Sequence, residues 1–215
     1  SRPKIRVASL SHDLLASAIN PVQPSNGRSL HIVKRHIECV RSTGQFCEDE
    51  SPTMPELVKE REKARLLLGK SSRPVVVVVT GANHRHRTYP IEQWNQVAGY
   101  LISQGCQVAS LGTVGQPSLS SPDAKNLIGQ LSIREAMAVL AEADLVLSGD
   151  TGPGHIAAAY GTPLVSIFGH MNPKQCRPVG DPVVVLREGT SAADVPVHAV
   201  TKASEELLRT CQRVS

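Results

Sequence analysis

The 215-residue chain has few aromatic residues and lacks long apolar runs. Phe, Trp and Tyr make up 3% of it and the formal net charge is a mild +4, so there is little material for the stacking platforms and basic grooves that bind nucleic acids. The most hydrophobic run, 75–79, has the length of a strand, whereas a membrane-spanning helix needs about 20 apolar residues. These absences argue against a nucleic-acid-binding protein and against a transmembrane segment.

The cysteines are five in number and none of them forms a CxxC pair. An odd number at this spacing argues against a disulfide scaffold and against a zinc site. The N-terminal region has no apolar signal-peptide core, so we predict reduced thiols and a cytoplasmic protein. The chain begins at Ser1 instead of a methionine, and we interpret it as a processed or truncated piece of a longer protein.

Short apolar runs alternate with amphipathic segments from residue 74 onward. The expected strands are 75–79, 108–111, 127–128, 145–148, 164–168 and 183–186, and the expected helices are 91–103, one opened by Ser132, 154–160 and 197–211. Such alternation is typical of βαβ units, which build an open parallel sheet with helices on both faces. We therefore predict an α/β, Rossmann-like domain over 74–190 and a C-terminal helix in 191–215.

The helix opened by Ser132 carries a capping-box pattern, because Glu135 follows three residues later. Its apolar stripe has helical spacing and is expected to be buried; the stripe consists of Ile133, Ala136, Met137 and Leu140.

The first 73 residues have a different pattern. We expect a strand or its remnant at 5–10, a helix within 30–44 and a charged helix at 55–68. His31 and His36 are five positions apart, which puts them on different faces of a helix and argues against a shared metal ion. A stretch of about 70 residues is short for a Rossmann domain, so we interpret 1–73 as the remnant of an N-terminal domain and an interdomain linker.

A glycine-rich turn joins the strand at 145–148 to the next helix. It contains Asp150, Thr151, Gly152 and, within the first helical turn, His155. Glycines let a ligand approach the backbone, and the amides and positive dipole end at a helix start favour an anion such as phosphate. Thr151 and His155 can donate hydrogen bonds to the same anion. The alternative is that Asp150 or Thr151 caps the helix and His155 is an ordinary surface residue.

The loop after the first strand, TGANHRHRTYP at 80–90, lies on the same edge of such a sheet. Arg85 and Arg87 are suited to clamp a diphosphate and to stabilise the charge that develops when it leaves. The alternative is that both arginines are merely solvated. His84 and His86 resemble a metal-ligand pair, but no third ligand is evident, so we expect no metal.

These two loops carry a resemblance. The segment DTGPGHIAAAYGTPLVSIFG, continued by MNPKQCRPVG, is similar to the signature of glycosyltransferase family nine, the lipopolysaccharide heptosyltransferases. GANHRHRTYPIEQW looks like that family's first loop, with Arg87 at a lysine position and Tyr89 at a tryptophan position. The resemblance extends from about Pro74 to the C-terminus.

The resemblance implies the C-terminal, donor-binding half of a GT-B glycosyltransferase. Such enzymes transfer a sugar, commonly heptose from ADP-heptose, to a lipopolysaccharide-type glycolipid or saccharide acceptor, with inversion and without a metal or other cofactor. A lipid-linked acceptor implies peripheral contact with the inner face of the cytoplasmic membrane. Carried over by position, the donor contacts are Gly81, Ala82, Asn83, Arg87, Asp150, Thr151, Gly152 and His155, with Arg87 and His155 stabilising the leaving diphosphate.

Two features depart from the family pattern. The family often has an acidic residue after the second strand to hold the ribose, and this chain offers only Asp123, late in the loop. The family's catalytic base comes from the N-terminal domain, and nothing around Asp13 marks it as that base.

We therefore expect that this chain alone binds a nucleotide sugar without turning it over. A non-catalytic binding module and a sugar-nucleotide epimerase of the same fold are the alternatives. A dehydrogenase is disfavoured because no GxGxxG follows the first strand.

Overall fold

A computed structural model describes residues 30–42, 44–46, 51–69, 72–82 and 87–212. The chain divides into two compact units, one made of Ser1–Ser51 with Asn172–Cys176 and the other of Pro52–Met171 with Arg177–Ser215. The first unit contains the expected helix, α1 (Ile32–Arg41), and a short helix, α6 (Pro173–Cys176). His31 is the N-cap of α1, where its Nδ1 accepts a hydrogen bond from Val33 N at 3.3 Å. Asp13 lies outside the described residues.

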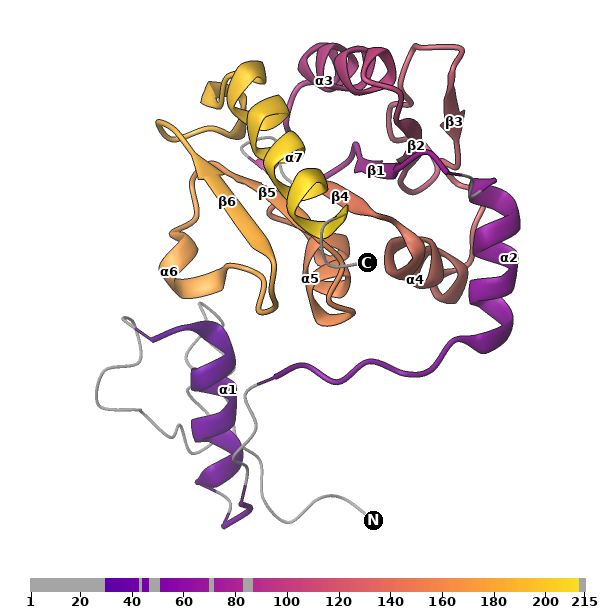
Figure 1. Ribbon diagram of the computed structural model, residues 1–215. Helices are drawn as coiled ribbons and strands as arrows, with labels where there is room; N and C mark the ends of the chain where they lie inside the picture. Colours follow the sequence, from indigo (N-terminus) through magenta and orange to yellow (C-terminus); the bar gives the residue numbers. More distant parts are fainter. Residues whose placement is uncertain (1–29, 43, 47–50, 70–71, 83–86, 213–215) are drawn as a thin grey trace. The chain divides into compact units, whose positions relative to one another are not determined.

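The second unit is built on a parallel sheet, as predicted (Figure 1). Its strands are β1 (Val75–Val79), β2 (Gln107–Leu111), β3 (Ala124–Asn126), β4 (Leu145–Gly149), β5 (Leu164–Phe168) and β6 (Val183–Arg187), in the order β3-β2-β1-β4-β5-β6. The Rossmann-like prediction is confirmed. One strand was wrongly placed, because 127–128 follows β3 and does not belong to it.

Helices precede, connect and follow the strands. They are α2 (Val58–Leu68), α3 (Ile91–Ser103), α4 (Ile133–Glu142), α5 (Gly152–Ala159) and α7 (Val197–Gln212), with a 3₁₀ turn, η3, at Ala192–Asp194. The predicted capping box of Ser132 and Glu135 is present at the start of α4. Within the described part of the chain, none of the helices combines the length and apolar character needed to cross a membrane.

The five valines of β1 show how the sheet is covered on both faces, since all of them are buried. Val75, Val77 and Val79 pack in a core with α2, α4 and α5, whereas Val76 and Val78 pack in a second core with α3 and α7. Side chains alternate along a strand, so a central strand covered by helices on both sides is apolar at every position. This is why the sequence signal for β1 is a continuous run of valines.

Ion pairs fasten α2 to α4. The buried carboxylate of Glu142 accepts two hydrogen bonds from Arg65, at 2.7 and 3.0 Å, and lies 3.4 Å from Arg61 Nε. Lys63 donates to Glu135 at the other end of α4. These contacts hold α2 against α4. The bidentate pair between Arg65 and Glu142 fixes the orientation of the two helices as well as their distance.

The strand order creates a switch point between β1 and β4. From β1 the chain winds outward to β2 and β3, and from β4 it winds the other way to β5 and β6. Val79 and Ser148 are partners in the register, so the loops that leave β1 and β4 start side by side. In doubly wound sheets this carboxyl edge is where ligands bind.

Candidate functional site

A cavity of about 650 Å³ opens at the carboxyl ends of β1, β2 and β4. Its walls come from the loops after β1 and β2, from one face of α4 and from the start of α5. Of the residues predicted from the sequence, it is lined by Gly81, Ala82, Arg87, Asp150, Thr151 and Gly152. The two loops singled out in the sequence therefore share one cavity.

Two predicted donor contacts are missing from the described residues that line this cavity. Asn83 lies outside the described residues, as do His84, Arg85 and His86. His155 lies in the first turn of α5 and is absent from the residues that line the cavity, although its charge is one of two that lower the pKa of Asp150. Its predicted contact with the donor stays a prediction.

The start of α5 lies at the cavity and begins at Gly152, two residues earlier than predicted. Thr151 is the N-cap, but its side chain makes no capping hydrogen bond; its Oγ1 instead lies 2.8 Å from Ser148 Oγ. The alternative that Thr151 caps the helix through its side chain is therefore wrong. Pro153, at the second helical position, has no N–H group to satisfy. A helix start of this kind presents its positive end to the cavity.

Asp150 and Arg87, which both line the cavity, form an ion pair. Arg87 Nε lies 3.4 Å from Asp150 Oδ2, and the Asp150 side chain is 6% exposed, compared with 34% for Arg87. Among the described residues, Asp150 Oδ2 accepts no hydrogen bond. Burial raises the pKa of Asp150, and the charges of Arg87 and then His155 oppose that rise without cancelling it. The site thus holds a half-exposed guanidinium beside a buried carboxylate that has spare hydrogen-bonding capacity.

The backbone around Arg87 is held by close packing. A Cβ atom at Gly149 would lie 2.7 Å from the carbonyl oxygen of Arg87, so only glycine allows the end of β4 to approach this loop so closely. Two residues later, Tyr89 is buried in the core, donates a hydrogen bond to Val195 O at 3.1 Å and meets the Trp94 ring edge-on at 4.7 Å. Burial raises the pKa of Tyr89 to about 12. Tyr89 is thus a structural anchor for the segment that carries Arg87.

The apolar stripe of α4 has a different role from the one predicted. Ile133 is 75% exposed and Ala136 and Met137 are half-buried, so the expectation of a fully buried stripe is wrong for these three. All three line the cavity, as does Leu140, which is buried. The stripe therefore forms an apolar wall that faces a ligand site and not only the core. Helical spacing identifies these residues as one stripe but does not distinguish a protein core from a cavity wall.

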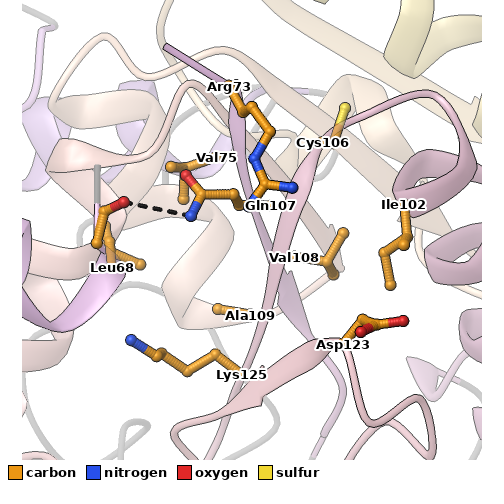
Figure 2. Close-up of a pocket in the computed structure, with 11 residues that line it drawn as sticks. Leu68, Arg73, Val75, Ile102, Cys106, Gln107, Val108, Ala109, Asp123 and Lys125 are labelled. Carbon is orange, nitrogen blue, oxygen red and sulfur yellow. Dashed lines mark hydrogen bonds between the residues drawn. The ribbon is translucent and has the colours of Figure 1, made fainter. Parts of the chain in front are cut away.

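A second cavity, of about 450 Å³, lies near the amino ends of β1 and β2, and Figure 2 shows its polar residues Arg73, Gln107, Asp123 and Lys125. Gln107 Nε2 donates to the carbonyl oxygen of Gly69 at 3.2 Å, and Lys125 donates to that of Leu67. These bonds fasten the end of α2 to the edge of the sheet.

This location corrects the expectation for Asp123. Asp123, the only acidic residue of the loop between β2 and β3, lines the second cavity and does not line the one at the carboxyl edge. The carboxyl-edge cavity instead contains Gln116, Val114 and Thr113 from that loop, which sequence analysis did not single out.

In the part of the chain that the structure describes, no group of three or more His, Cys, Asp or Glu residues is arranged to hold a metal ion. The expected metal independence stays a prediction.

Comparisons with known proteins agree with this architecture. The family model for "Glycosyltransferase family 9 (heptosyltransferase)" matches residues 14–203. Lipooligosaccharide heptosyltransferase 2 of Haemophilus influenzae is 30% identical over 150 residues, which are 64% of this chain and 43% of the relative. The chain therefore spans less than half the length of that relative in this match.

Solved structures share the fold. Escherichia coli ADP-heptose lps heptosyltransferase II has a TM-score of 0.79 and 20% identity, with 96% of this chain and 70% of the other covered. Escherichia coli heptosyltransferase WaaC, solved with ADP, has a TM-score of 0.66 and 21% identity, with 92% and 63% covered. The family match spans most of the residues, including both loops of the site, and on this basis the chain belongs to glycosyltransferase family 9, the heptosyltransferases.

Proposed function

We propose that this chain is the donor-binding part of a glycosyltransferase that transfers heptose from ADP-heptose to a lipopolysaccharide-type acceptor. The observation that carries the proposal is the cavity at the β1–β4 switch point, where a guanidinium and a helix start lie together beside an apolar wall. Family membership supports the class of reaction, and a relative of the same fold was solved with ADP.

The diphosphate of the donor is assigned to the polar end of this cavity. Arg87 is 34% exposed and lines the cavity, so its remaining N–H groups are available to phosphate oxygens. The amide of Gly152 and the positive end of α5 add to the same field. When the bond to the sugar breaks, charge builds on the diphosphate, and these fixed groups stabilise it.

The nucleoside is assigned to the apolar end. Ile133 and Met137 from α4 and Val114 from the loop after β2 line the same cavity, and Val114 is 85% exposed. A flat base inserted there covers apolar surface that otherwise faces water.

The described residues supply donor binding and not the base of an inverting transfer. Among the described residues that line the cavity, Asp150 is the one carboxylate, and it is paired with Arg87. A base must reach the acceptor hydroxyl, which an ion-paired carboxylate in the donor cavity is poorly placed to do. We propose that the chain alone binds the donor without turnover, that the reaction uses no metal, and that the acceptor is met at the cytoplasmic face of the membrane.

Isothermal titration calorimetry with ADP, UDP and GDP tests the donor assignment. We expect ADP to bind and Arg87→Leu to weaken its binding by about tenfold, as expected for the loss of a charge-assisted contact to phosphate. Arg73→Leu is the matched control, because Arg73 carries the same charge but lines the second cavity. Equal losses in both variants would show a nonspecific charge effect. Absence of ADP binding by the wild type, or steady heptose transfer by the chain alone, would contradict the proposal.

A further inference from the structure

Gln116 occupies the edge of the site cavity between the loops after β1 and β2. These loops start together, since Val79 and Leu111 are partners in the register and Thr80 N donates to Leu111 O at 3.3 Å. Thr80 Oγ1 also donates to the carbonyl oxygen of Pro117 at 2.6 Å. The backbone on the C-terminal side of Gln116 is therefore tied to the first loop of the site.

Gln116 is tied on its N-terminal side by a tight turn. Its backbone N–H donates to Thr113 O at 3.1 Å, and Gly115 supplies the left-handed residue of the turn with a φ of 85°. The side chain then folds back, and its Oε1 accepts a hydrogen bond from Thr113 N at 2.9 Å. The backbone on both sides of Gln116 and its side-chain amide oxygen are thus held in place.

Two glycines make room for this side chain. A Cβ atom at Gly81 would lie 2.0 Å from Gln116 Cδ, and one at Gly112 would lie 2.5 Å from its Oε1. The amide group therefore reaches across from the β2 loop to the backbone of the β1 loop. Both glycines and Gln116 line the site cavity.

The orientation of the amide determines what it offers to a ligand. Because a backbone N–H group requires an acceptor, the oxygen must face Thr113, and the NH₂ group takes the other position. Within the residues that the structure describes, that NH₂ group donates to no protein acceptor. It is a fixed donor at the cavity edge.

We propose that Gln116 is a specificity-determining residue that reads the ribose of the nucleotide as a hydrogen-bond donor. In doubly wound folds the loop after the second strand meets the ribose, where an acidic side chain normally accepts from a hydroxyl group. Here Gln116 takes that place and requires an oxygen that accepts. The site therefore does not need the hydroxyl hydrogen of the ribose, and an ether oxygen at the same position can still accept the hydrogen bond. This inference rests on the proposed function, since it assumes a nucleotide in this cavity.

Gln116→Glu is a nearly isosteric test of this polarity. One carboxylate oxygen can still accept from Thr113 N, and the other replaces the NH₂ group with an acceptor at the same point. Gln116→Leu removes both functions and serves as the control. The added negative charge of the glutamate weakens the binding of every nucleotide, so the measurement compares ligands within each variant.

The ligands are ADP and its 2′- and 3′-deoxy and 2′- and 3′-O-methyl analogues, titrated by calorimetry into each variant. At the position that Gln116 contacts, we expect the wild type to bind the deoxy analogue about fivefold more weakly than ADP, as for the loss of one neutral hydrogen bond. Gln116→Leu should lose that preference. For the O-methyl analogue, the dissociation constant divided by that of ADP should be about fivefold higher in Gln116→Glu than in the wild type, because the carboxylate needs the hydroxyl proton. The bulk of the methyl group is the same in both proteins and cancels in this comparison.

A wild type that binds ADP but distinguishes neither deoxy analogue overturns the role of Gln116 and leaves the proposed function intact. So does an O-methyl ratio that is the same in the wild type and in Gln116→Glu. Failure of ADP to bind at all removes the proposed function and this inference together.

Discussion

Gly149→Ala tests whether close packing between β4 and the first loop positions Arg87. The added Cβ would lie 2.7 Å from the carbonyl oxygen of Arg87, a contact with backbone that no side-chain rotation relieves. Overpacking of this kind costs about 1–3 kcal/mol. For a chain of this size, each kcal/mol lowers Tm by roughly 2–4 °C. Urea unfolding should therefore show a loss of stability, and calorimetry should show weaker ADP binding because Arg87 is displaced from the cavity.

Two other glycines provide controls for Gly149→Ala. A Cβ atom at Gly152 or at Gly99 meets nothing within 4 Å. Gly99 lies inside α3, so Gly99→Ala should stabilise the protein by about 0.5–1 kcal/mol through helix propensity. Gly152→Ala should leave stability nearly unchanged. A Gly149→Ala variant as stable as the wild type, or one that is destabilised while its ADP affinity stays the same, would show that this packing does not position Arg87.

Three further predictions concern the charges and the apolar wall. Burial raises the pKa of Asp150, and the charge of Arg87 opposes that rise more strongly than the charge of His155 does. Arg87→Leu should therefore raise the pKa of Asp150 further, as followed by carboxyl carbon NMR; a fall would contradict the ion pair. Ile133→Ser should change the free energy of unfolding by less than about 0.5 kcal/mol, because Ile133 is 75% exposed, and yet weaken ADP binding about threefold; equal affinity would remove Ile133 from the site. Hydrogen bonds, above all the one from Lys63, lower the pKa of Glu135 to about 2. The ionised Glu135 therefore stabilises the fold above the usual pKa of 4.5, and this stabilisation is lost as pH falls from 4.5 toward 2. Tm should drop more steeply over that range in the wild type than in Glu135→Gln, and parallel curves would count against this.

The elements that the sequence predicted well are those buried by the fold itself. The valines of β1 are apolar because both faces of the strand are covered, and this pattern is visible without any structure. β3 was misplaced for the opposite reason. This edge strand has little burial, so its residues Ala124, Lys125 and Asn126 show no apolar pattern. The neighbouring Leu127 is buried, and its apolar character led to the strand being predicted at 127–128.

The site was predicted in part. Glycine-rich turns and clustered cations identify a phosphate-binding edge because strand ends and helix starts demand particular residues there. Spacing alone does not reveal whether an apolar stripe faces protein or ligand, which is why Ile133 was assigned to the core. Gln116 carries no charge and follows no motif, and only the three-dimensional approach of Gly81 and Gly112 reveals its place. Asp123 had the expected chemistry but lies at the other end of the strands.

We propose that the switch-point cavity binds the diphosphate of a nucleotide. Backbone amide NMR during an ADP titration tests it most directly. Saturating ADP should shift the amide signals of Gly81, Thr151 and Gly152 along one binding curve, while those of Gln107 and Lys125 at the second cavity stay in place. Shifts confined to the second cavity, or saturation without any change at Gly152, would contradict the account.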